Sequence, residues 1–261
     1  MALDKQQLAS LKQYLDREAT AINSVDFIKN DPVQFPRRFE ALRDIEIAAL
    51  LSATIAWGNR KMICNNCEKM LAIMEGEPAA FVDEAAYEDL PDDLNLHRTF
   101  FARNLKYMMR GLKSIYDKYP SLNHFAAAHH VGDSEEPAWR LVELMQQHMA
   151  DANGGATDSR CLPTNLTNTA LKRINMALRW LVRDDGIVDM GVWTAIKPSQ
   201  LFIPLDVHVG NTARALGLID RRANDKKTVL ALTSLLRKFR PDDPVIYDYA
   251  LFGVGINNSS S

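Results

Sequence analysis

The sequence predicts an all-α protein, and three observations support this fold class. No segment alternates apolar and polar residues as a half-buried strand does. Apolar residues recur instead at helical spacing from one end of the chain to the other. Residues that commonly start helices stand before several of these segments. We therefore expect helices at 3–22, 44–57, 60–75, 98–118, 136–150, 167–183, 206–216, 226–239 and 244–252.

Two of these helices have recognisable ends. Asp44 is expected to cap the helix at 44–57, and Gly58 follows its last turn. Asp243 and Pro244 combine a capping residue with the residue best suited to the first helical position, and Gly253 is expected to end that helix.

The segment 45–57 is apolar on nearly all sides, which predicts a central buried helix. The segment 151–168 is rich in Gly, Asn, Thr and Asp and is expected to be the longest internal loop. It leads into the helix that carries Lys172.

The composition is that of an ordinary globular protein, with 47% hydrophobic and 25% charged residues. A net charge of −2 excludes a surface covered in positive charge but is compatible with a local basic stripe. The acidic segments 83–93 and 132–136 are expected to be solvated faces.

Without a targeting or membrane segment we expect a cytoplasmic protein and no membrane partner. Cys64 and Cys67 lack a second metal-binding pair, so packing is favoured and no metal or cofactor is expected.

Lys172 is the first candidate for chemistry. It lies in an early turn of a helix whose other residues are largely apolar. An amine near such a surface and near a helix N-terminus is a candidate nucleophile. The alternative is a surface lysine whose stem covers apolar neighbours.

Asp206 is the second candidate, and it follows the apolar run LFIP directly before a helical segment. This position predicts a helix N-cap. A capping carboxylate can still face a cleft with its second oxygen and stabilise positive charge there. The two roles are therefore compatible.

Further residues point to a nucleic-acid site. Asp248 and Phe252 are four residues apart, so they lie on one helix face, where a ring and an acceptor can hold an extruded base. Phe252 as a plain core residue is the alternative. Basic side chains that can contact a phosphate backbone gather near the candidate lysine and aspartate: Arg60, Lys61, Arg173, Arg179 and Arg214.

Three segments carry a resemblance to a known family. LLSATIAWGNRKMICNNCEKML, KRINMAL and IPLDVHVGNTARALGL resemble motifs of the helix-hairpin-helix DNA glycosylases, the endonuclease III superfamily. The whole chain also resembles an uncharacterised bacterial family whose nearest characterised relatives are archaeal 8-oxoguanine DNA glycosylases. The resemblance implies two helical lobes with a cleft between them, the first at 45–183 and the second formed by 1–44 and 184–261.

The resemblance also implies roles for individual residues. Lys172 matches the nucleophile that attacks C1′ of a flipped nucleotide, and Asp206 matches the aspartate that stabilises the sugar cation. Asp248 and Phe252 match residues that hold a damaged purine. Trp57 lies where relatives insert a side chain into the gap left by the base, with a core position as the alternative. The four-cysteine iron–sulfur motif is absent, so no cluster is expected.

Together with these residues, the resemblance implies a DNA glycosylase with lyase activity on an oxidised purine such as 8-oxoguanine, with DNA as partner, and we expect a monomer. The alternative is a non-catalytic nucleic-acid-binding protein that keeps the glycosylase fold, because the segment LPTNLTNTA lacks the glycines of the family hairpin. A helical protein-interaction scaffold is a third possibility.

Overall fold

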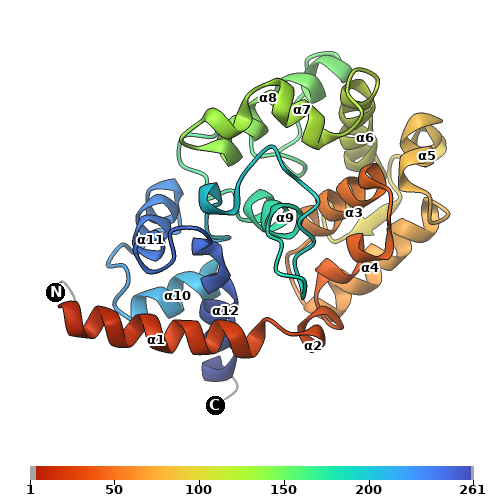
Figure 1. Cartoon of the computed structure of the whole chain (residues 1–261). Coiled ribbons are helices and arrows are strands. Elements are labelled where there is room, and N and C mark those ends of the chain that lie inside the picture. Colours follow the sequence, from red (N-terminus) through yellow and green to blue (C-terminus); the bar gives the residue numbers. More distant parts are fainter. Residues whose placement is uncertain (1–3, 260–261) are drawn as a thin grey trace.

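The computed structural model describes residues 4–259, with side chains described as far as residue 255, and nearly all of its regular structure is helical (Figure 1). The predicted all-α class is thus confirmed. The helices are α1 (Lys5–Ile22), α2 (Val25–Ile28), α3 (Leu42–Thr54), α4 (Arg60–Ile73), α5 (Pro78–Asp83), α6 (Ala102–Tyr116), α7 (Leu122–Ala128), α8 (Pro137–Ala152), α9 (Lys172–Val182), α10 (Val207–Ala215), α11 (Lys226–Phe239) and α12 (Tyr247–Ser259). None of these described helices is both long and apolar enough to cross a bilayer.

Each helix expected from the sequence has a counterpart, and the structure adds elements that were not expected. The short helices α2, α5 and α7 are additional. Strands β1 (Asn95–His97) and β2 (Phe100–Phe101) form an antiparallel hairpin where the helix at 98–118 was expected to begin. The loop between α8 and α9 is present as predicted.

Two of three expected helix ends are wrong, whereas Asp243 and Pro244 stand, as predicted, at the N-cap and first position of the 3₁₀ turn Pro244–Ile246 that precedes α12. Asp44 lies inside the first turn of α3, and its Oδ1 accepts a hydrogen bond from Ala79 N at 2.7 Å in α5. Asp243 makes no capping hydrogen bond, because its carboxylate is paired with Arg183. Gly253 lies within α12, where an added Cβ would be 2.6 Å from Cγ1 of Ile22.

Helix α3 is the buried centre that the sequence predicts, because every residue from Ile45 to Thr54 is buried. Helix α9 packs against α3 in the middle of the molecule, whereas α12 packs against α1 and α10 (Figure 1). Helices α3 and α9 thus form one group, and helices α1, α10 and α12 form a second. The two groups meet around α9, and residues of both groups line one cavity.

A buried carboxylate links α3 to the rest of the central helices. Glu46 accepts hydrogen bonds from Leu122 N at 2.8 Å, Asn123 N at 2.9 Å and Trp193 Nε1 at 2.8 Å. Burial nonetheless raises the pKa of Glu46 to about 7. Glu46 thereby connects α3 to the start of α7 and to the segment that follows α9.

Candidate functional site

A cavity of 940 Å³ lies where the two groups of helices meet. This volume is within the usual range for a small-molecule or cofactor site. Residues from α2, α4, α9, α10, α12 and the connecting segments line it, including Phe27, Asp31, Trp57, Arg60, Thr99, Arg160, Lys172, Arg173, Met176, Arg179, Asp206, His208, Asp248 and Phe252. Lys172, Asp206, Asp248, Phe252 and Trp57 thus line one cavity.

Lys172 is the first residue of α9, and it is half-buried at the cavity wall. Its Nζ lies 3.5 Å from Sδ of Met176, one turn along the helix. In the described part of the chain it forms no ion pair. The backbone just before it is strained, because Leu171 has a left-handed φ of 49° without being glycine. This turn sets the direction in which α9 presents the amine.

Asp206 is the N-cap of α10, which confirms the predicted cap. Its Oδ1 accepts a hydrogen bond from Val209 N at 3.0 Å. Its backbone oxygen accepts hydrogen bonds from Gly210 N at 2.9 Å and from Asn224 Nδ2 at 3.2 Å. Among the described residues, Oδ2 accepts no hydrogen bond. The second carboxylate oxygen is thus available to a ligand in the cavity.

Asp248 is a buried carboxylate of α12 that faces the same cavity. Its Oδ2 accepts a hydrogen bond from Arg179 Nη1 within a short ion pair. Burial raises the pKa of Asp248 to about 6, against the opposing charge of Arg179. The charge of Asp206 raises this pKa further and that of Lys172 lowers it, because both residues are close enough to interact electrostatically with Asp248.

Phe252 lies one turn after Asp248 and is half-buried in the cavity wall. Its ring makes an edge-to-face contact with the ring of Phe27, and the two ring centroids lie 6.1 Å apart. The guanidinium of Arg60 lies over the Phe252 ring at 4.8 Å from its centroid. An aromatic ring and a cation thus form one wall of the cavity.

Trp57 is half-buried at the cavity wall, between a histidine and an arginine. Its ring lies edge-on to His97 at 4.7 Å, and the Arg173 guanidinium lies 5.7 Å from its centroid. Arg173 donates hydrogen bonds to Thr54 O and Arg160 O, both at 2.8 Å. Arg173 therefore fixes the loop before α9 against the end of α3, whereas the neighbouring Lys172 makes no such contact with the loop residues that the structure describes.

Arg179 and Arg214, which were also predicted to contact a DNA backbone, are occupied by other protein groups, as Arg173 is. Arg179 is 4% exposed and pairs with Asp189 and Asp248. Arg214 does not line the cavity, and its guanidinium donates to Arg221 O, Arg222 O and Asn224 Oδ1. Folding already uses donors of Arg173, Arg179 and Arg214, so these arginines are poorly placed to contact a DNA backbone. Lys61 is exposed and lies outside the cavity, while Arg60 lies within its wall.

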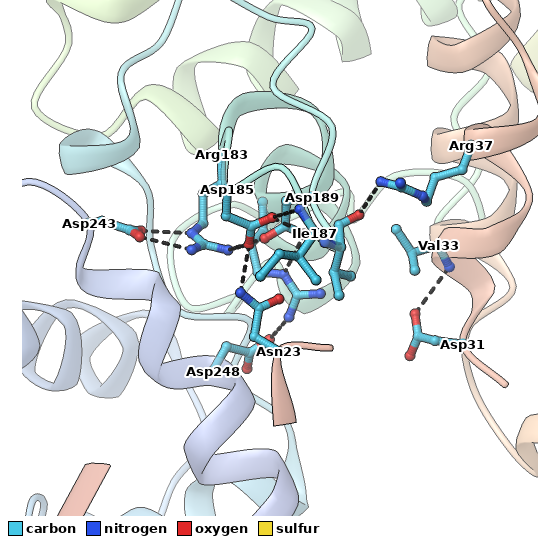
Figure 2. Close-up of polar contacts among 12 residues, drawn as sticks. Asn23, Asp31, Val33, Arg37, Arg183, Asp185, Ile187, Asp189, Asp243 and Asp248 are labelled. Atoms are coloured by element: carbon cyan, nitrogen blue, oxygen red, sulfur yellow. Dashed lines mark hydrogen bonds and ion pairs between the residues drawn. The ribbon is translucent and has the colours of Figure 1, made fainter. Parts of the chain in front are cut away.

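A network of buried charges includes Asp248 of the cavity wall (Figure 2). Arg183 pairs with Asp243 at 2.7 Å, with Asp185 at 3.0 Å and with Asp189 at short range. Asp189 also accepts a hydrogen bond from Arg179 Nε at 3.3 Å, and Asp185 accepts one from Asn23 Nδ2 at 2.9 Å. The network joins α9 to α12 and to the end of α1.

Several lining residues were not predicted from the sequence. Asp31 caps the short 3₁₀ helix η1 (Pro32–Gln34), and its Oδ1 accepts from Val33 N at 3.1 Å. The dipeptide Asp31-Pro32 is itself a helix-start signal. Arg160 lies in the long loop, where no periodicity marks it. Among the described residues, no cluster of three or more His, Cys, Asp or Glu side chains is placed to hold a metal ion.

These observations define a helical protein with a charged cavity that combines an amine, three carboxylates and the aromatic rings of Phe27, Trp57 and Phe252. A family described as "Protein of unknown function (DUF2400)" matches residues 31–257, and the chain belongs to this family. No curated protein and no solved structure matches the chain.

Proposed function

We propose that this protein is a DNA glycosylase with lyase activity, of the helix-hairpin-helix type, that removes an oxidised purine such as 8-oxoguanine. The observation that carries the proposal is the meeting of Lys172, Asp206 and Asp248 in one cavity of 940 Å³. An amine and two carboxylates around a space of this size match the groups that base excision requires.

In the proposed reaction Lys172 supplies the nucleophile. Its neutral amine forms a bond to C1′ of the flipped nucleotide while the bond from C1′ to the base nitrogen breaks. The base takes up the proton that the amine loses. Opening of the sugar ring then gives an imine between Lys172 and C1′, and loss of a proton from C2′ eliminates the 3′ phosphate.

Asp206 stabilises the positive charge that develops on the sugar as the base departs. Its Oδ1 is held by Val209 N, while Oδ2 is unengaged within the described residues. A carboxylate fixed in this way needs no reorganisation when the charge appears.

Asp248 and Phe252 hold the base in this proposal. Arg179 occupies Oδ2 of Asp248, which leaves Oδ1 to accept from a ligand. A guanine-type base offers N–H donors on its Watson–Crick edge, whereas an adenine ring nitrogen at the same place is an acceptor. The carboxylate therefore favours a guanine-derived lesion, and Phe252 supplies a face for stacking.

The positive wall of the cavity favours a polyanionic partner. Among the described residues, Arg60, Arg160 and Lys172 line the cavity without forming ion pairs, whereas Arg38 on a neighbouring surface pairs with Glu68 at 2.8 Å. Cations that folding leaves unneutralised are available to phosphates.

The test is borohydride trapping on a duplex that contains 8-oxoguanine. The wild-type chain should form a covalent protein–DNA adduct and release the base. Lys172→Gln should form none while it still binds the duplex, and Lys118→Gln, which changes an exposed lysine outside the cavity, should trap as the wild type does. A wild-type protein that binds the damaged duplex but yields neither adduct nor free base would reject the proposal.

A further inference from the structure

The hairpin formed by β1 and β2 ends at the mouth of the cavity. His97 pairs with Phe100, so Arg98 and Thr99 form the exposed tip. Thr99 lines the cavity. Arg98 adopts a left-handed φ of 49°, a conformation that a non-glycine residue keeps only where its surroundings impose it.

The hairpin is fixed to the cavity wall by a buried histidine. His97 Nε2 lies 3.0 Å from Trp57 O, and His97 Nδ1 lies 2.8 Å from Asn66 Nδ2. A neutral imidazole that donates from Nε2 and accepts at Nδ1 satisfies both contacts. Burial lowers the pKa of His97, which favours this neutral form. Asn95 Nδ2 donates to Arg98 O at 2.7 Å and closes the turn. The tip therefore has a defined position.

The side chain of Arg98 lies against Gly58, which lines the cavity. A Cβ added to Gly58 would be 2.8 Å from Arg98 Nη1. In the described part of the chain Arg98 forms no ion pair, although Lys106 and Arg110 of the following helix pair with Asp92 and Glu88. An unneutralised guanidinium thus stands at the entrance.

A second hollow of 640 Å³ begins at Asn59, beside Gly58, and continues along the outer face of α4. Lys61, Asn65 and Lys69 are exposed in this hollow at intervals of four residues, which places them on one helix face. Neither lysine forms an ion pair among the described residues, and Glu68 of the same hollow is engaged by Arg38 at 2.8 Å.

We propose that Arg98, Lys61 and Lys69 form a phosphate-binding track for the nucleic-acid strand beside the cavity. Lys61 and Lys69 are separated by about 12 Å along the helix axis, which corresponds to the rise of roughly three to four nucleotides of one strand at about 3.4 Å each. The track begins at the mouth through which a flipped nucleotide enters. It rests on the proposed function for that nucleotide, but binding of the backbone does not require that the base be released.

The test is the salt dependence of binding of the full chain to an undamaged DNA duplex. Arg98→Ala combined with Lys61→Ala and Lys69→Ala removes the track. The matched control removes three exposed lysines that line neither hollow, Lys118, Lys227 and Lys238. Each lost phosphate contact lowers the slope of log K against log salt by about 0.9, so the track variant should lose about 2 to 3 in slope and about tenfold or more in affinity.

The control variant should keep a slope close to that of the wild type. Lys61→Ala with Lys69→Ala, which leaves the hairpin intact, should lose about two thirds of the effect. Equal slopes for the track and control variants would overturn the proposal, and so would a wild-type chain that does not bind DNA at low salt. A wild type that binds through the track but forms no borohydride adduct would reject base excision and support the track.

Discussion

The two ends of helix α9 carry similar charges in different surroundings. Lys172, Arg179 and Arg183 follow one another at helical spacing along one side of the helix. At the N-terminal end Lys172 is half-buried beside the cavity and forms no ion pair among the described residues. At the C-terminal end Arg183 is 2% exposed and contacts Asp185, Asp189 and Asp243 (Figure 2).

This difference separates a residue that holds the structure from one that is available for chemistry. Burial disfavours the charged form of Arg183, but the carboxylates of Asp243 and Asp189 outweigh that effect and raise its pKa. Lys172 forms no ion pair among the described residues, so an anionic or electrophilic ligand in the cavity can be its partner. Changes at the C-terminal end should therefore alter stability, and changes around the N-terminal end should alter activity or binding.

The largest expected effect is at the C-terminal end. Arg183→Met leaves three carboxylates without their shared cation, so we expect the free energy of unfolding to fall by about 3–5 kcal/mol. Urea unfolding followed by circular dichroism measures this loss. Arg140→Met is the control, because the ion pair of Arg140 with Glu143 is exposed and should contribute less than about 1 kcal/mol. Equal losses in the two variants would remove the distinction between the two ends.

The second effect is at the cavity that Lys172 faces. Asp206→Asn replaces the carboxylate by an amide that caps a helix equally well, so the unfolding free energy should change by less than about 0.5 kcal/mol. Loss of the negative charge should slow base release by about 10²–10³-fold, as measured in single-turnover assays on a duplex containing 8-oxoguanine. An unchanged rate would exclude Asp206 from the chemistry.

The sequence predicts the N-terminal end of α9 better than the C-terminal end. Lys172 and Asp206 precede or begin apolar helical segments, and such positions are visible as local patterns. Arg179 and Arg183 have the same appearance, but their partners Asp248 and Asp243 lie far along the chain and are found only through tertiary packing. Spacing within one helix therefore cannot tell a phosphate contact from a buried ion pair.

The elements missed by the sequence analysis share a physical reason. Strands β1 and β2 have three and two residues, which is too short for alternation to appear. Helix α2 has four residues and α5 has six, so neither completes the apolar repeat of an amphipathic helix. Long periodic segments such as those of α3 and α11 were predicted, because tertiary contacts reinforce their local preference.

A pH effect links the two ends of α9 through Asp248, which pairs with Arg179 and also interacts with Lys172 and Asp206. Because the pKa of Asp248 is raised to about 6, the carboxylate that we propose accepts a hydrogen bond from the base becomes protonated as the pH falls through 6. Affinity for a duplex with an uncleavable 2′-fluoro analogue of the lesion should then fall by up to about tenfold per pH unit. Asp248→Asn should show a flatter profile, and an equal fall in both would exclude Asp248 as the acceptor.

The sign of the stability effect separates this loss from acid unfolding. The pKa of Asp248 in the folded chain lies above the unfolded value of 3.8, so the folded state binds more protons between pH 3.8 and about 6. The contribution of Asp248 to folding stability therefore increases as the pH falls through this window, while binding of the base weakens. Measuring unfolding and binding over the same pH range distinguishes the two.

The smallest expected effect concerns Arg60, which lies over the ring of Phe252 at 4.8 Å. Like Lys172 it is a cation of the cavity wall without an ion pair in the described chain, but its partner is an aromatic face. Arg60→Ala removes a charge from the cavity wall that we propose faces the phosphates, together with a cation–π contact of about 0.5–1 kcal/mol that positions the Phe252 ring, so affinity for the same duplex should fall about two- to fivefold. Arg60→Lys keeps the charge but loses the planar group. If the contact of Arg60 with the Phe252 ring contributes to binding, Arg60→Lys should lose part of the affinity even at high salt. Full affinity of this variant at high salt would show that only the charge of residue 60 contributes.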